Sequence, residues 1–204
     1  MNNIVIYIKQ RINIWLWLAV SLFLILLSLQ ELKISQFHVL SLPFVFLFLI
    51  VMRLFDDIAS AEVDKAKENR IYTTVCVKNE LKRVLIALHL ILLGVLSIFD
   101  IQRALLLLLF FALNQLLYSF LFKRAKCRYF LPLFKYPFVV FLLNFELSYQ
   151  LVAVYFAFVI FEMLDDKTFP GYLLEGYKGS LINKKYFPYF FLFLFLLIHL
   201  ILIY

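Results

Sequence analysis

Two groups of acidic residues are the side chains in this sequence best suited to chemistry. The first group consists of Asp56, Asp57, Glu62, Asp64, Glu68 and Glu80, and the second of Glu162, Asp165, Asp166 and Glu175. Each group follows an apolar run, and carboxylate oxygens are the ligands that Mg²⁺ prefers, commonly together with substrate phosphates. Both groups are therefore candidate metal sites. The alternative is that they are solvated charges paired with neighbouring lysines.

The spacing in both groups fits helices that continue from the apolar runs. At about 100° per residue, a helix places residues three and four apart on one face. One stripe of the first helix would carry Arg53, Asp57, Ser60, Asp64 and Glu68. Glu162 and Asp166 would likewise share a face. We expect each group to present its carboxylates together at the end of a helix.

The composition indicates that the helices positioning these groups lie in a membrane. Hydrophobic residues make up 65% of the 204 residues and charged residues 16%, and the mean hydropathy is +0.96. Soluble domains carry about 45–50% apolar and about 25% charged residues. Scarce Gly, Pro and Cys exclude collagen-like and disulfide-scaffold classes, and the many Phe and Tyr exclude disorder. A polytopic membrane protein is expected, and a water-soluble enzyme is excluded.

Seven apolar runs are long enough to cross the bilayer core as helices. The predicted spans are 12–29, 37–55, 83–99, 102–122, 130–145, 147–163 and 186–204. Because the runs are continuously apolar and do not alternate, they predict helices and not a membrane barrel. We expect an all-α, polytopic transmembrane helix bundle, one membrane domain over 1–204, with acidic loops at 56–82 and 164–185. Only Asn144 and Glu146 mark the boundary between the fifth and sixth runs, so one long re-entrant segment is the alternative there.

The distribution of Lys and Arg predicts the orientation of the bundle. With seven spans, nearly all basic residues fall on one side of the membrane, while the other side holds only Lys33 and Arg103. The positive-inside rule then places the N-terminus and the acidic loops in the cytoplasm of an integral membrane protein, which we expect in the bacterial inner membrane. This bias, with attraction to anionic membrane lipid, explains the net charge of +7 without a nucleic-acid partner.

Residues 53–64, RLFDDIASAEVD, resemble the first aspartate-rich motif of the UbiA superfamily of intramembrane prenyltransferases, N-D-x-x-D-x-x-x-D. In this register Asp56 takes the Asn position, Asp57 and Asp64 take the first and last Asp positions, and Ser60 replaces the middle aspartate. One branch of the family has the form R-x-x-D-E-x-K-D-x-E-x-D, which is matched at Arg53, Asp56, Glu62 and Asp64.

Residues 162–166, EMLDD, followed by GYKGS at 176–180, resemble the second motif of the family, D-x-x-x-D with a G-x-K-S-like stretch. Glu162 stands where Asp is usual. The two motifs of the family lie in cytoplasmic loops after helices 2 and 6, and both acidic groups follow the corresponding predicted spans here. Family members usually have nine helices, so the seven predicted spans resemble a bundle shortened by the last two.

The resemblance implies Mg²⁺-dependent transfer of an isoprenyl group from a prenyl diphosphate to a hydrophobic acceptor, an aromatic or quinone precursor, within the membrane. Neutralising the departing diphosphate is the role that Mg²⁺ and basic side chains play in such a reaction. The implied metal ligands are Asp56, Asp57, Asp64, Glu162 and Asp166, and the implied diphosphate ligands are Arg70 and Lys178.

Two alternatives to an active transferase remain open. Ser60 cannot supply the missing negative charge, so a catalytically degenerate relative could bind isoprenoid or quinone, or act as a structural subunit, alone or as an oligomer. A transporter would carry more ionisable residues deep within its spans and often broken helices in repeated halves. Such residues are few here, which disfavours transport.

Overall fold

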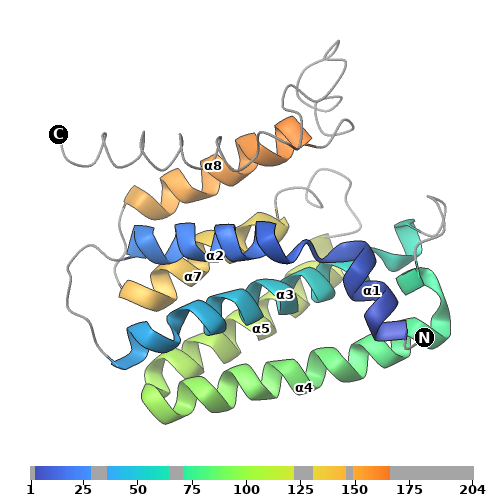
Figure 1. The fold of residues 1–204 in the computed structure, drawn as a ribbon, viewed down its shortest axis with the longest axis horizontal. Coiled ribbons are helices and arrows are strands. Elements are labelled where there is room, and N and C mark those ends of the chain that lie inside the picture. The colour runs from blue at the N-terminus through green and yellow to red at the C-terminus, as the bar shows by residue number, and fades with distance from the viewer. Residues whose placement is uncertain (1–2, 29–35, 65–70, 122–130, 146–148, 166–204) are drawn as a thin grey trace. The chain divides into compact units, whose positions relative to one another are not determined.

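The computed structural model describes residues 3–28, 36–64, 71–121, 131–145 and 149–165, and all of its regular structure in these ranges is helical (Figure 1). The all-α prediction is therefore confirmed for the described part of the chain. The chain divides into two compact units. Unit 1 comprises residues 1–21 and 33–118, and unit 2 comprises residues 22–32 and 119–204.

Unit 1 begins with α1 (Asn3–Arg11) and the first half of α2 (Ile14–Ser28), which meet at a bend of 63°. The side chain of Asn13, between the two helices, accepts a hydrogen bond from the backbone N–H of Leu16 at 3.3 Å. An Asn at this position satisfies an N–H group that the first turn of a helix leaves without a partner. The bend therefore coincides with a new helix start.

The long helix α3 (Gln36–Asp64) follows in unit 1 and packs mainly on α4 (Val75–Phe99). The short 3-10 helix η1 (Ile71–Thr73) precedes α4 and contacts α3, α4 and α1. Phe48, Leu49 and Met52 of α3 are at most 1% exposed, and the Phe48 ring lies against Phe110 and Phe111 with centroids 6.0 and 6.4 Å apart. The predicted span 37–55 lies within α3.

A helical hairpin completes unit 1, formed by α4 and α5 (Ile101–Leu121). Asp100 separates the two helices and caps α5, because its Oδ1 accepts hydrogen bonds from the backbone N–H groups of Gln102 and Arg103 at 2.9 and 3.2 Å. At 1.5 Å per residue, α4 and α5 are about 37 and about 31 Å long, enough to cross a hydrocarbon core of about 30 Å.

Two of the described helices are long and apolar enough to span a membrane, Cys76–Phe99 and Ile101–Phe120, and α1 with α2 would add a third if the bent pair is one span. Much of the apolar surface of α4 and α5 is exposed, at Ile86, Leu90, Ile91, Ile98, Leu105, Leu108, Leu109, Leu113, Leu116 and Phe120. Such faces suit contact with lipid. The full count of seven spans stays a prediction, since 186–204 lies outside the described residues.

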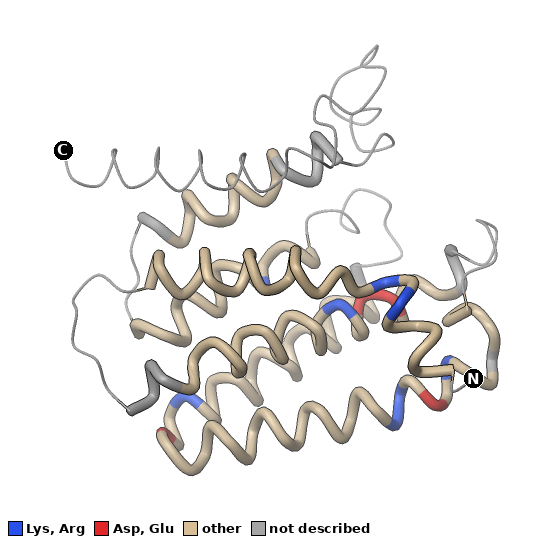
Figure 2. Tube along the Cα trace, in the orientation of Figure 1, with Lys and Arg blue, Asp and Glu red and all other residues tan. Residues whose placement is uncertain are grey.

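The described charges of unit 1 gather at the two ends of its helices (Figure 2). One end comprises α1, the C-terminal half of α3 and the start of α4, and the other is the α4–α5 turn with Asp100 and Arg103. Apolar helix separates the two ends. This separation is typical of a protein whose charged groups lie on either side of a bilayer.

Unit 2 contains the end of α2, the 3-10 helix η2 (Leu131–Phe134), α7 (Lys135–Asn144) and α8 (Tyr149–Asp165). Tyr136 stacks on Phe158 with ring centroids 3.5 Å apart, and Phe23 meets Phe158 at 6.4 Å. α7 ends where Phe145 adopts a left-handed backbone conformation with φ of 61°. The predicted boundary between the fifth and sixth runs thus falls between two separate helices.

Candidate functional site

Four members of the first acidic group, Asp56, Asp57, Glu62 and Asp64, lie on a helix that continues from its apolar part, as the spacing predicted, whereas Glu80 lies on α4 and Glu68 lies outside the described residues. α3 is helical through Arg53, Asp57 and Asp64 without a break. Nε of Arg53 lies 3.5 Å from Oδ1 of Asp57, so these residues do share one face of α3. Ser60 donates its hydroxyl to the backbone carbonyl of Asp57 at 3.3 Å.

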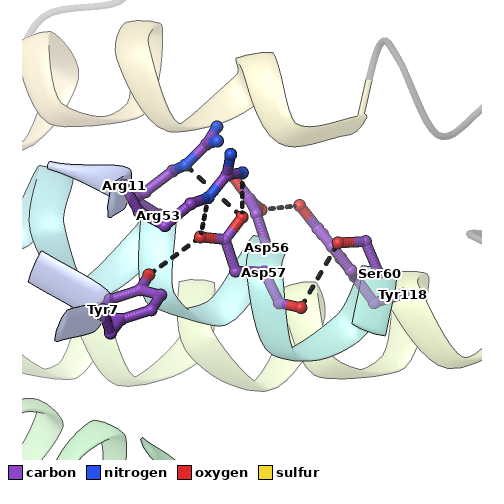
Figure 3. Close-up of polar contacts among 7 residues, drawn as sticks. All are labelled: Tyr7, Arg11, Arg53, Asp56, Asp57, Ser60 and Tyr118. Atoms are coloured by element: carbon purple, nitrogen blue, oxygen red, sulfur yellow. Dashed lines mark hydrogen bonds and ion pairs between the residues drawn. The ribbon is translucent and has the colours of Figure 1, made fainter. Parts of the chain in front are cut away.

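Asp57 is the centre of a buried polar cluster that joins α3 to α1 (Figure 3). Arg11 donates from Nε to Oδ2 at 2.9 Å and from Nη2 to Oδ1 at 2.6 Å. The Tyr7 hydroxyl also donates to Oδ2, at 2.9 Å. Asp57 is only 2% exposed. Both oxygens of a buried carboxylate are thus bound by donors from α1, in the two-point geometry that Arg and carboxylates favour.

These contacts keep Asp57 ionised. Burial on its own would raise the pKa of the Asp57 carboxyl, but the hydrogen bonds from Arg11, the positive charges of Arg53 and Arg11 and the Tyr7 hydroxyl outweigh it. The pKa of Asp57 therefore lies below its ordinary value. A carboxylate in this state balances positive charge from α1 and from its own helix.

Asp56, the neighbouring carboxylate, joins α3 to α5. The Tyr118 hydroxyl of α5 donates to Oδ1 of Asp56, and both residues are buried. The Tyr118 ring lies edge-to-face with Phe55 at 4.8 Å between centroids. Because adjacent helical residues point about 100° apart, Asp56 and Asp57 tie α3 to two different helices.

A stripe of residues four apart holds α1 on the rest of unit 1. Asn3 donates to Oε2 of Glu80 at 3.1 Å, Tyr7 binds Asp57, and Arg11 binds the same carboxylate. Tyr72 of η1 supports this stripe, since its ring meets Tyr7 edge-on at 6.4 Å and lies 5.3 Å below the Arg11 guanidinium. The inner face of α1 is therefore polar and specifically paired.

The other predicted site residues are not brought into this cluster by the described part of the chain. Asp64 and Glu162 are helical residues of α3 and α8, and nothing is described of their side chains. Arg70, Asp166 and Lys178 lie outside the described residues. The two acidic motifs belong to different units. It remains a prediction that both motifs bind the same diphosphate through Mg²⁺.

Both oxygens of Asp57 accept hydrogen bonds from Arg11 and Tyr7 in this arrangement, so a Mg²⁺ ion at Asp57 would share the carboxylate with these donors. Within the ranges that the structure describes, no three His, Cys, Asp or Glu side chains converge. The proposal of magnesium at the full ligand set remains a prediction, since three of its five carboxylates have no described side chain.

Three members of the cluster were not singled out from the sequence: Tyr7, Arg11 and Tyr118. The four-residue spacing of Tyr7 and Arg11 is a local signal that they share a helix face. Tyr118 had no such signal, because it lies on another helix, 62 residues from Asp56.

Comparison with known proteins gives no relative for this chain: no family model matches it, and neither a curated protein nor a solved structure does. The similarity to the UbiA superfamily therefore rests on the two motifs and their placement after predicted spans.

Proposed function

We propose that this chain is an integral membrane protein, similar to the UbiA superfamily, in which the first acidic motif joins helices and does not carry out prenyl transfer. Its role would be that of an isoprenoid- or quinone-binding or structural component of the bacterial inner membrane. The observation that carries this proposal is the engagement of both Asp57 oxygens by Arg11 and Tyr7, with Arg53 beside them.

Charge balance supports a structural role for the cluster. The guanidinium groups of Arg11 and Arg53 balance the carboxylates of Asp56 and Asp57, and Ser60 adds no negative charge where the family motif has an aspartate. A divalent cation binds readily where carboxylates are in excess. Here it would have to compete with two fixed cations for buried carboxylates, and breaking such a pair is costly.

The membrane part of the proposal is supported by helix length and surface. α4 and α5 are long enough to cross a bilayer, and exposed leucines, isoleucines and phenylalanines cover their outer faces. The orientation, with α1 and the acidic end of α3 in the cytoplasm, follows from the positive-inside bias of the sequence.

An active Mg²⁺-dependent prenyltransferase is the second candidate. It is favoured by the register of α3, which keeps Arg53, Asp57 and the backbone of Asp64 on one continuous helix as the family motif would need. In this candidate an isoprenyl diphosphate and its metal would compete with Arg11 for Asp57. The two candidates therefore differ in what Arg11 does.

The experiment measures binding of a non-hydrolysable isoprenyl diphosphate analogue to the purified full chain, with and without Mg²⁺. If the cluster has a structural role, we expect no Mg²⁺-dependent binding of the analogue. Arg11→Gln should then destabilise the fold, and the variant should still show no Mg²⁺-dependent binding. For the transferase, binding should depend on Mg²⁺ and be lost in Asp57→Asn but kept in Asp100→Asn, the matched change at the other end of unit 1. That second result would overturn the proposal. Mg²⁺-independent binding of a polyprenol or quinone would separate lipid binding from a purely structural role.

A further inference from the structure

The outer face of α1 has no role in the Asp57 cluster. Asn3, Tyr7 and Arg11 point inward and bind Glu80 and Asp57, so these contacts set the rotation of α1 about its own axis. The opposite face carries two apolar side chains, Val5 at 41% and Ile8 at 38% exposed, together with exposed Lys9. α1 therefore turns its paired polar side chains toward the rest of unit 1 and exposes Val5 and Ile8 beside Lys9 and Gln10, whereas a helix beside water would turn its apolar side chains inward.

The elbow between α1 and α2 continues this apolar surface. Just after the 63° bend, Ile14 is 51% and Trp15 is 81% exposed, whereas Trp17 is buried. α2 then runs from Ile14 to Ser28 without a charged residue. A large exposed Trp thus stands where the chain changes direction and enters its first apolar helix.

We infer that α1 lies along the membrane surface, with Val5 and Ile8 at the boundary between phospholipid headgroups and acyl chains and with Trp15 anchoring the elbow there. Helices with one apolar face and flanking Lys bind lipid surfaces in this way, and Trp is enriched at the same depth. Only Ile12 and Asn13 separate α1 from α2, and the three Cα–Cα steps from Arg11 to Ile14 span about 11 Å at most. α1 therefore cannot lie far from a bilayer that α2 enters. The inference rests on the membrane part of the proposed function and not on the role of the acidic motif.

The test is depth-dependent quenching of Trp fluorescence in proteoliposomes of the full chain, with spin-labelled phospholipids. The chain has two Trp, so Trp17→Phe leaves Trp15 as the sole reporter. Adding Trp15→Phe and Ile8→Trp moves the reporter to the outer face of α1, and Val5→Trp is a second probe of that face. Leu108→Trp in the same background is the matched control for the bilayer interior, since Leu108 is 51% exposed within α5.

For Trp15 and for the Ile8→Trp and Val5→Trp probes, we expect stronger quenching by a label near the headgroup than by one near the acyl-chain end. Leu108→Trp should show the reverse order. If the Ile8→Trp and Val5→Trp probes are both quenched more strongly by the label near the acyl-chain end, α1 and α2 form one broken span, and the inference is overturned. If both α1 probes are quenched by aqueous acrylamide and by neither lipid label, the inference is also overturned. Quenching of Leu108→Trp by the acyl-chain label would then show that the protein is nevertheless embedded in the bilayer. If Leu108→Trp itself escapes lipid quenching, the membrane part of the proposed function fails as well.

Discussion

Arg11 and Asp57, 46 residues apart in the chain, form a two-point ion pair in which Nη2 lies 2.6 Å from Oδ1 and Nε lies 2.9 Å from Oδ2. The pair connects the first helix of the chain to the acidic end of α3. A residue that the sequence suggests as a metal ligand thus takes part in a contact between helices.

Breaking this ion pair from one side should be costly. Asp57→Leu leaves the Arg11 guanidinium, with a side chain 17% exposed, beside an apolar group, and Arg11→Leu leaves the Asp57 carboxylate buried. We expect each change to lower the free energy of unfolding by about 3 kcal/mol, and the double variant to lose less than the sum of the two. Equilibrium unfolding in mixed micelles measures this. Additive losses in the double variant would contradict a direct interaction.

The contribution of Asp57 should depend on pH in one direction. Because the pKa of Asp57 is lower in the folded chain than in the unfolded chain, its stabilising effect is fully present above about pH 4 and is lost as the pH falls through the folded value. The difference in unfolding free energy between the wild type and Asp57→Asn should stay constant between about pH 5 and 8 and narrow under stronger acid. If the unfolding free energies of the wild type and Asp57→Asn keep the same difference down to the most acidic pH, Asp57 does not titrate in this way.

The two tyrosine hydroxyls that bind the carboxylates should each stabilise the fold. Tyr7→Phe and Tyr118→Phe remove a donor to a charged acceptor and keep the rings that contact Tyr72 and Phe55. We expect losses of about 2 kcal/mol each. Tyr155→Phe, whose ring packs on Phe134, is the matched control and should change stability by less than about 0.5 kcal/mol. Equal losses of stability at all three positions would mean that the hydrogen bonds from the Tyr7 and Tyr118 hydroxyls do not stabilise the fold.

Placing an aspartate at position 60, where the aspartate-rich motif that residues 53–64 resemble has one, should create a metal site. Ser60→Asp adds a third carboxylate next to Asp57, within a cluster in which two arginines now balance two aspartates. We expect Mg²⁺ affinity to rise at least tenfold over the wild type, because an excess of negative charge favours a hard divalent cation. Titration calorimetry measures the affinity, and Ser97→Asp near the other end of unit 1 is the control. No increase in Ser60→Asp would count against the register of the motif.

The sequence by itself was sufficient for the local features of this chain. Continuous apolar runs predicted helices, and the runs at 83–99 and 102–122 correspond to α4 and α5 with the turn at Asp100 between them, although α4 begins at Val75, inside the predicted loop 56–82. The spacing of Arg53 and Asp57 predicted a shared face, and their ion pair confirms it. These features depend on hydrogen bonds and side chains within about one helical turn, so a few neighbouring residues determine them.

The partners of the carboxylates could only be decided by tertiary structure. Tyr7 and Arg11 reach Asp57 because α1 bends by 63° from α2 and lies against η1 and α4, and Tyr118 reaches Asp56 from α5. No local spacing encodes which distant helix faces a given residue. A carboxylate looks the same in a sequence whether a metal ion or an arginine will neutralise it, and packing brought the arginine to Asp57.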